Sequence, residues 1–265
     1  MIVWLNGAPM ADDVARIAPS DRAFTLGDGL FETMRLADGA VVHIARHLRR
    51  LRAGAAALGI PLDAADAGLA HALAATASAN GLTSAALRLT LSRGPAERGI
   101  ALPASPQPTL VITAGALPAQ DGPLHAVIAT TTRRNEHSPL SRVKSLNYLD
   151  SILARREAVA RGADEAVLLN TRGAAAETSI ANLIVLRDGR LLTPPVSDGA
   201  LPGIMREVLV ERAGLAEATL LPADLLAADA VFACSALGVR AVASVDGRTL
   251  PECHGLLARL RSFGR

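Results

Sequence analysis

The stretch RVKSLNYLD, residues 142–150, holds the only lysine and the only tyrosine of this 265-residue chain, Lys144 and Tyr148. Lysine and arginine together number 27, so all the other cations of this kind are arginines. The two residues are nearly equivalent on a solvated surface, but only a lysine amine can lose its proton when it is buried. Lys144 is therefore a candidate for covalent chemistry, such as a Schiff base to a carbonyl. A chance remnant on a surface helix explains the composition equally well.

The composition narrows the class of protein. Half of the residues are hydrophobic, which is ample for a large core, and the formal net charge of +2 argues against nucleic-acid binding, which needs a concentrated basic patch. The two cysteines, without zinc-type spacing, predict neither a disulfide framework nor a metal site. The opening residues predict no signal peptide, and the apolar runs are too short to predict a membrane span. We therefore expect a cytoplasmic enzyme or binding protein with no membrane partner.

Before residue 118, strand and helix patterns together predict an α+β domain with an antiparallel sheet. The stretch LFETMRLADGAVVHI, residues 30–44, reads as two strands around an Asp-Gly turn, which is a strong hairpin signal. Helices are expected over 43–60 and 64–80, ending near Gly59 and at Asn80-Gly81. Further strands are expected over 2–7, 86–94 and 109–117.

A segment rich in proline, glycine and polar residues, 118–123, is the predicted linker between two domains, 1–117 and 124–265. The second domain is expected to be larger and to mix helices with strands. Its strands are expected over 125–132, 165–170, 182–195, 230–237 and 242–250, and its helices over 147–162, 203–215 and about 251–262. Asp-Gly turns at 188–189 and 246–247 fall within these patterns. The 230–237 strand is expected to run into a loop.

Lys144 comes just before a predicted helix and after a strand and a polar loop, which indicates the edge of a sheet rather than a helix surface. Tyr148 follows about one helical turn later, so its hydroxyl can point at whatever the lysine holds. A phenol is a natural hydrogen-bond partner for a phenolate oxygen. Pyridoxal 5'-phosphate (PLP) carries such an oxygen next to its reactive aldehyde, and the pair of residues is compatible with a PLP site.

A PLP site also needs a partner for the pyridine nitrogen and donors for the phosphate. Glu177 lies in a turn of small residues before a strand, where a carboxylate needs a cation such as a protonated pyridinium, although a surface turn is the commoner setting. The LPGIMRE stretch, 201–207, exposes backbone N–H groups at the start of a helix, as any helix cap also does. The CSALG stretch, 234–238, offers a second cradle between a strand and a loop.

Together, these segments resemble the class IV aminotransferases, the fold type IV PLP enzymes. The matching stretches follow the family's order over nearly the whole chain: SDRAFTLGDGLFETMRL, HLRRL, KSLNYLDSILARREA, ADEAVLLNTRG, ETSIANLIVL, LPGIMRE and CSALGVRAV. The resemblance implies a mixed α/β fold of the D-amino acid aminotransferase type, with a small N-terminal domain, a larger C-terminal domain and PLP between them. It also implies a homodimer in which a loop of one subunit closes the neighbour's site.

The resemblance assigns roles to the matching positions. Lys144 is similar to the Schiff-base lysine that also moves protons, and Glu177 is similar to the partner of the pyridine nitrogen. The other cofactor-binding positions are a phosphate arginine, a tyrosine for the phenolate oxygen, an asparagine and four backbone donors: Arg50, Tyr148, Asn182, Ile204, Met205, Ser235 and Ala236. Many transaminases of the family have threonine at the position of Met205, so this chain lacks only that side-chain contact.

The family contains both transaminases and 4-amino-4-deoxychorismate lyase, which eliminates pyruvate and leaves 4-aminobenzoate for folate biosynthesis. The GIMR stretch, the C-x-A-L run at 234–237 and the SRGPAERGI loop are similar to the lyase, which is therefore the favoured reaction. Ile100 departs from the lyase pattern, which usually has an aromatic residue there. Transaminases of D-amino acids, branched-chain amino acids or chiral (R)-amines are the alternatives, and a catalytically inactive PLP-binding homologue is a remote one.

Five positions are expected to contact the substrate: Phe31, Thr33, Arg35, Arg98 and Arg240. The three arginines are candidates for binding a substrate carboxylate. Arg240 is expected in a loop, where an exposed cation without a binding role is the simpler interpretation.

Overall fold

The computed structural model describes residues 1–119 and 122–264, which form two compact units. The first unit consists of Met1–Pro118 together with Val143–Asn147, and the second consists of Ala119–Arg142 together with Tyr148–Arg265. The predicted linker includes residues 120 and 121, which lie outside the described residues. The segment that carries Lys144 thus groups with the first unit, although the sequence on both sides of it belongs to the second.

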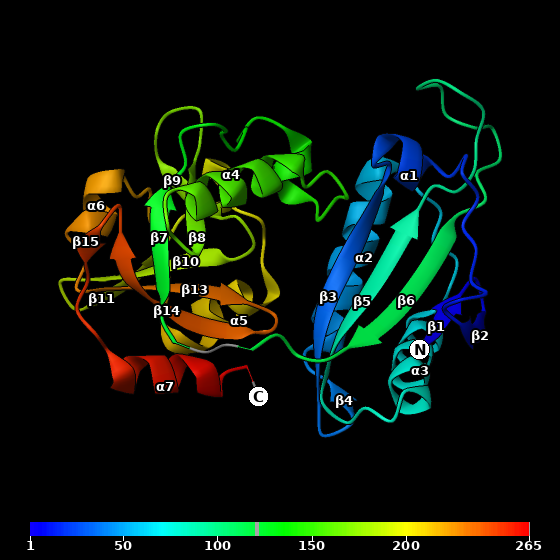
Figure 1. Cartoon of the computed structure of the whole chain (residues 1–265), viewed down its shortest axis with the longest axis horizontal. Helices are drawn as coiled ribbons and strands as arrows, with labels where there is room; N and C mark the ends of the chain where they lie inside the picture. Colours follow the sequence, from blue (N-terminus) through cyan, green and yellow to red (C-terminus); the bar gives the residue numbers. More distant parts are fainter. Residues whose placement is uncertain (120–121, 265) are drawn as a thin grey trace. The chain divides into compact units, whose positions relative to one another are not determined.

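The first unit is an antiparallel sheet with two long helices on one face (Figure 1). Its described strands follow the order β2-β1-β6-β5-β3-β4. They are β1 (Ile2–Leu5), β2 (Ala8–Ala11), β3 (Gly29–Ala37), β4 (Ala40–Val41), β5 (Ala85–Ser92) and β6 (Thr109–Gly115). The helices are α1 (Arg22–Leu26), α2 (Ile44–Leu58) and α3 (Asp66–Ala79). This confirms the antiparallel α+β arrangement that the sequence predicts.

Strand β3 contributes side chains to both faces of this sheet, because successive residues of a strand point to opposite sides. Leu30, Met34 and Leu36 are buried in the core beneath α2 and α3. Phe31, Thr33 and Arg35 therefore lie on the face that these helices do not cover.

The segment Val143–Asn147 extends the first unit's sheet along β3. The backbone N–H of Phe31 donates to the carbonyl of Lys144 at 2.9 Å, and the N–H of Leu146 donates to the carbonyl of Gly29 at 2.9 Å. Only glycine fits at position 29, since a Cβ there would lie 2.6 Å from the Leu91 carbonyl oxygen. The edge-of-sheet position predicted for Lys144 is therefore observed, but at the sheet of the first unit.

The second unit is a mixed sheet with helices packed against it (Figure 1). Its strand order is β12-β11-β10-β13-β14-β7-β8-β9, with β15 beside β14; β7 pairs in parallel with β14 and β8. The strands are β7 (Leu124–Ile128), β8 (Glu165–Leu169), β9 (Ala175–Thr178), β10 (Asn182–Arg187), β11 (Arg190–Thr193), β12 (Ala216–Glu217), β13 (Ala230–Ser235), β14 (Gly238–Val245) and β15 (Arg248–Thr249). The α-helices are α4 (Leu149–Ala160), α5 (Ile204–Ala213), α6 (Pro222–Leu226) and α7 (His254–Ser262), with 3-10 turns at Pro139–Arg142 and Val196–Asp198.

The three Asp-Gly pairs that the sequence analysis assigned to hairpin turns all form them. Asp38-Gly39, Asp188-Gly189 and Asp246-Gly247 each have positive φ at both residues, as a type I′ turn requires. Asn6-Gly7 makes a fourth such turn between β1 and β2, which the sequence analysis missed although an Asn-Gly pair signals it. No helix in the described part of the chain is long and apolar enough to cross a membrane.

Two local predictions were wrong. The helix predicted from Asn147 begins at Leu149 with Tyr148 as its N-cap, because the Asn147 amide instead donates to the carbonyl of Gly27 at 3.3 Å. The strand over 230–237 does not run into a loop: β13 turns tightly at residues 236–237 and pairs with β14 from Gly238 onward.

Candidate active site

In the first unit, Lys144 lies against the uncovered face of the sheet. Its side-chain nitrogen is 4.4 Å from the centre of the Phe31 ring, and the guanidinium carbon of Arg88 is 3.7 Å from the same ring. Both distances are within the range of cation–π contacts. Arg88 comes from β5, directly opposite Thr33, and its Nε donates to the Thr90 hydroxyl at 3.2 Å. This face therefore brings together the lysine, an aromatic ring and a second cation.

Arg35 adds a further cationic group to this face of β3. Its Nε is buried and has no hydrogen-bond partner among the described residues. A buried donor without an acceptor costs about 1–3 kcal/mol, so an acceptor bound there would be favoured. Arg35 was predicted from the sequence but Arg88 was not, because the pairing of β3 with β5 joins residues about fifty positions apart and has no local signal.

The structure does not place Arg98 on this face. Arg98 is exposed in the loop between β5 and β6, which Arg22 anchors through hydrogen bonds from its Nη1 to the carbonyls of Gly99 and Ala101. Arg50 also lies elsewhere in the unit. It extends from α2 on the covered side of the sheet and forms a bidentate ion pair with Glu32, at 2.8 Å from Nε and 2.6 Å from Nη2.

In the second unit, Glu177 is a nearly buried carboxylate on β9 with two fixed partners. Its Oε1 pairs with Nε of Arg134 at 3.0 Å, and its Oε2 accepts the backbone N–H of Leu201 at 3.0 Å. Arg134 thus places one cation beside Glu177 from within the protein. That arginine was missed because two adjacent arginines in a polar loop give no signal of which one turns inward.

Leu201 connects Glu177 to the predicted phosphate cradle. Its carbonyl accepts a hydrogen bond from Nδ2 of Asn182 at 2.9 Å, and the Asn182 Oδ1 occupies the place that a Cβ at Gly203 would take. Gly203 is the N-cap of α5 and provides no side-chain cap, so the first N–H groups, those of Ile204 and Met205, have no partner within the helix.

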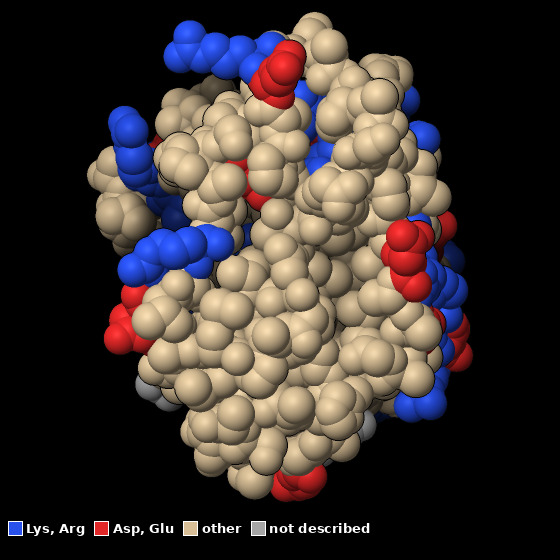
Figure 2. Space-filling model, turned by 90° about the vertical axis from the view of Figure 1, so that its right-hand side faces the viewer, with Lys and Arg blue, Asp and Glu red and all other residues tan. Residues whose placement is uncertain are grey.

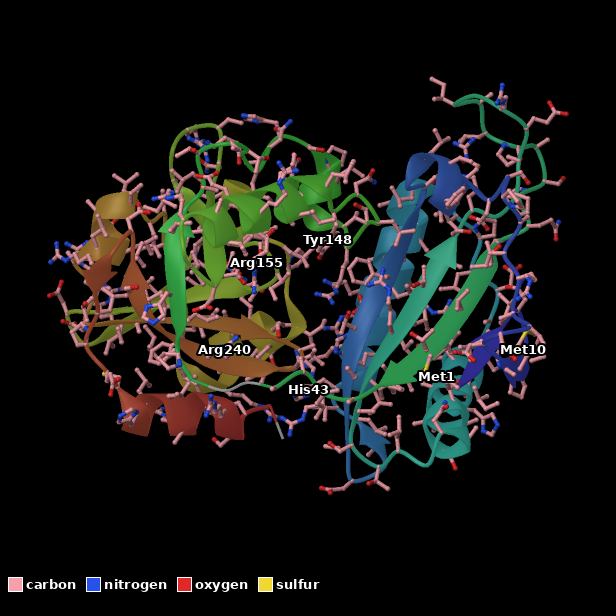
Figure 3. The ribbon with its side chains drawn as sticks, in the orientation of Figure 1. Met1, Met10, His43, Tyr148, Arg155 and Arg240 are labelled. Atoms are coloured by element: carbon pink, nitrogen blue, oxygen red, sulfur yellow. The ribbon has the colours of Figure 1, made fainter. Side chains whose placement is uncertain are left out.

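The turn after β13 lies next to the same asparagine, because Asn182 pairs with Cys234 across the sheet. Ser235 and Ala236 thus come close to the start of β10 in the second unit. Figure 3 shows two further candidates, Tyr148 at the start of α4 and Arg240 on β14. The loop position expected for Arg240 was wrong: it is a half-buried strand residue opposite Ala233 whose Nη2 donates to the Gly122 carbonyl at 3.2 Å.

These side chains fit PLP. The uncapped N-terminus of α5, closed by a glycine that tolerates no side chain, suits a phosphate group. The buried Glu177 carboxylate suits a protonated ring nitrogen, and Lys144 is a half-buried amine beside an aromatic ring. Bound PLP supplies the electron sink for breaking bonds at the carbon next to the substrate nitrogen.

Comparison with known proteins of similar sequence and structure supports the assignment of a PLP site. The family described as class IV amino-transferases matches residues 29–245. The putative branched-chain-amino-acid aminotransferase of Methanocaldococcus jannaschii is 32% identical, over 94% of this chain and 90% of that protein. The crystal structure of 4-amino-4-deoxychorismate lyase from Pseudomonas aeruginosa is 33% identical with a TM-score of 0.85, over 98% of this chain and 97% of that chain.

A second structure, the crystal structure of the branched-chain amino acid aminotransferase of Escherichia coli, is 28% identical with a TM-score of 0.93, over 98% of this chain and 92% of that chain. The fold and the side chains above define a PLP-dependent enzyme of fold type IV. The chain belongs to the class IV aminotransferase family, which confirms the resemblance drawn from its motifs.

Proposed function

We propose that this enzyme is a 4-amino-4-deoxychorismate lyase, which eliminates pyruvate from its substrate and leaves 4-aminobenzoate. The observation that carries the proposal is the cationic face beside Lys144, where Arg35 and Arg88 flank Phe31 and Thr33. 4-Amino-4-deoxychorismate carries two carboxylates, whereas a branched aliphatic side chain needs an apolar pocket. Bidentate guanidinium–carboxylate pairs are among the stronger polar contacts available for recognition.

We assign each site residue a separate role in binding the cofactor, binding the substrate or moving protons. Lys144 holds the cofactor covalently and moves the proton at the carbon next to the substrate nitrogen. Glu177 pairs with the ring nitrogen, and Tyr148 donates to the phenolate oxygen. The phosphate is bound by Arg50 and by a set of backbone N–H groups near Asn182, which are those of Ile204, Met205, Ser235 and Ala236. Arg35 and Arg88 bind substrate carboxylates, with Arg98 and Arg240 as further candidates.

A branched-chain amino acid transaminase is the second candidate. It is supported by the similarity to the putative Methanocaldococcus jannaschii aminotransferase, which covers nearly the whole chain. A transaminase needs a keto-acid acceptor, whereas the lyase does not, and this difference separates the two reactions.

Incubating the purified protein with 4-amino-4-deoxychorismate is expected to yield 4-aminobenzoate and pyruvate in equal amounts without any added keto acid. The products are measured by fluorescence and by a coupled pyruvate assay. A parallel incubation contains leucine, isoleucine or valine with 2-oxoglutarate. Turnover only in the second mixture would replace the lyase by the transaminase. An Arg88→Met variant is expected to lower kcat/KM for the lyase by about 10–100-fold, since it removes one charge-assisted contact.

We also propose that the enzyme is a homodimer. Supporting this, Phe24 is 80% exposed and Ile17 52% exposed, and both line a cavity of about 470 Å³ in the first unit. Exposed apolar groups that gather around a hollow are typical of association surfaces. Figure 2 shows a broad area of uncharged residues on one face, with charged side chains mostly at its margins.

Replacing Phe24 by aspartate is expected to weaken this association by about 2 kcal/mol or more, the scale of a central interface residue. Sedimentation velocity over a dilution series would then show monomer where the unchanged protein is a dimer. Leu221→Asp alters an exposed leucine of the second unit and is the matched control. Equal dissociation of both variants would show that the Phe24 surface is not the interface.

A further inference from the structure

Three titratable side chains meet on the covered side of the first unit's sheet. Glu32, in the middle of β3, is 0% exposed, and His47 of α2 is 1% exposed. The Nδ1 of His47 lies 2.6 Å from Oε2 of Glu32. Arg50, one turn further along α2, pairs with both oxygens of the same carboxylate. Glu32 therefore joins a histidine and an arginine within a core of leucines.

The protonation states of this cluster follow from its contacts. Burial raises the pKa of the Glu32 carboxyl, but the hydrogen bonds from Arg50 and His47 outweigh burial and hold that pKa below its usual value. Burial lowers the pKa of His47 below its usual value. Glu32 is thus ionised and His47 neutral near neutral pH. Since an ionised carboxylate only accepts hydrogen bonds, the proton of His47 lies on Nδ1.

Stability alone does not account for this cluster. Taking an ion pair out of water costs several kcal/mol per ion, and apolar side chains of similar volume at such positions are often neutral or stabilising. Leu48 and Leu51, on the same helix, show that the surroundings accept apolar residues. The carboxylate fixes the orientation of the Arg50 side chain, because two parallel hydrogen bonds set the plane of a guanidinium as well as its position.

The two elements that position Arg50, helix α2 and strand β3, also contact the segment that carries Lys144. Helix α2 contacts the lysine segment at Gly54, where a Cβ would lie 3.3 Å from Cγ1 of Val143. Val143 belongs to the same core cluster as Leu48 and Leu51. Glu32 itself follows Phe31, whose backbone N–H donates to the Lys144 carbonyl.

Resting on the assignment of Arg50 to the cofactor phosphate, we propose that Glu32 and His47 are positioning residues for that arginine. The carboxylate of Glu32, held in turn by His47, fixes the Arg50 guanidinium in the orientation that binds the phosphate of PLP. An arginine side chain otherwise loses up to about 2 kcal/mol of rotamer entropy when it is ordered. Ordering it in advance lowers this cost of binding.

The test compares PLP with pyridoxal, which has the same ring and aldehyde but no phosphate. Each is titrated into full-length protein freed of cofactor, and binding is followed by absorbance. Glu32→Gln is expected to weaken PLP affinity about tenfold, the size of one charge-assisted hydrogen bond, and to leave pyridoxal affinity unchanged. A purely structural role would weaken both ligands equally, and that result would overturn the proposal.

A double variant makes the dependence on Arg50 explicit. In an Arg50→Gln background the added Glu32→Gln change is expected to have no further effect on PLP affinity, because there is no guanidinium left to orient. A further tenfold loss in that background would overturn the proposal. Asp66→Asn is the matched control. It removes a surface carboxylate of α3 that pairs at 2.6 Å with Arg52, an arginine on α2 like Arg50. Its PLP affinity is expected to be unchanged.

A failure of this proposal is distinguishable from a failure of the proposed function. If Arg50→Gln itself leaves PLP affinity unchanged, the phosphate assignment is wrong. If Arg50→Gln weakens PLP binding but Glu32→Gln does not, only the positioning role is wrong. Should Glu32→Gln fail to fold by circular dichroism, His47→Leu replaces it, with a smaller loss that is again selective for PLP. If the His47→Leu variant then bound PLP as tightly as the unchanged protein does, the proposal would be overturned.

Discussion

Replacing Lys144 by alanine is expected to lower kcat by at least about 10²–10⁴-fold, which is the part that acid–base catalysis alone contributes. Loss of the proposed covalent attachment is expected to add to this. Lys144 is the only lysine of the chain, so no second lysine amine can take its place. Its contact with Phe31 holds the amine against an aromatic ring rather than in open solvent.

Lys144→Arg is the matched variant, because it keeps the positive charge and most of the side-chain length. It is expected to be as inactive as the alanine variant, since a guanidinium does not lose its proton in proteins. Borohydride reduction followed by peptide mass spectrometry should find a pyridoxyl group on residue 144 of the unchanged protein and on neither variant. A reduced pyridoxyl group on another residue of the unchanged protein would contradict the assignment.

Replacing Glu177 by glutamine is expected to lower kcat by about 10²–10³-fold, the effect typical of removing one preorganised electrostatic partner. Glutamine keeps the size of the side chain but removes the negative charge that we propose stabilises a protonated ring nitrogen. The glutamine amide has a single acceptor oxygen, so it can keep the hydrogen bond from the Leu201 N–H or the contact with Arg134, but not both.

Arg134→Met provides the comparison for this experiment. It removes the ion pair at 3.0 Å but keeps the carboxylate, so its loss of kcat is expected to be smaller than that of Glu177→Gln. The absorbance of bound cofactor, followed across pH, reports the proton on the ring nitrogen in each variant. A Glu177→Gln enzyme whose kcat and spectrum match those of the unchanged enzyme would show that this carboxylate does not pair with the ring.

Local chemistry made much of this fold predictable. The Asp-Gly pairs at 38–39, 188–189 and 246–247 specify their turns because both residues accept positive φ, and Gly59 ends α2 in the left-handed conformation that favours glycine. The alternation of polar and apolar residues in β5 likewise reports a sheet with one buried face. Such signals are contained within a few neighbouring residues, so a single sequence is enough to read them.

The site was less predictable because it depends on pairings between distant segments. Motif resemblance selected Lys144 and Glu177, but nothing local showed that Arg88 faces Phe31 or that Arg134 turns toward Glu177. The placement of Arg240 was wrong because a single basic residue between small apolar ones is compatible with either a strand or a loop. The pairing of residues 143–147 with β3 joins positions more than a hundred residues apart.

That last pairing has a consequence for the order in which the chain can fold during synthesis. The sheet of the first unit acquires its final edge only after residue 147 has left the ribosome, when part of the second unit has already emerged. A fragment that stops at Pro118 would lack Val143 from its core and leave the backbone N–H of Phe31 without its acceptor, the Lys144 carbonyl. We therefore expect that no single cut yields two stable halves, and that a permuted gene joining residues 143–147 directly to the first unit is needed to obtain that unit alone.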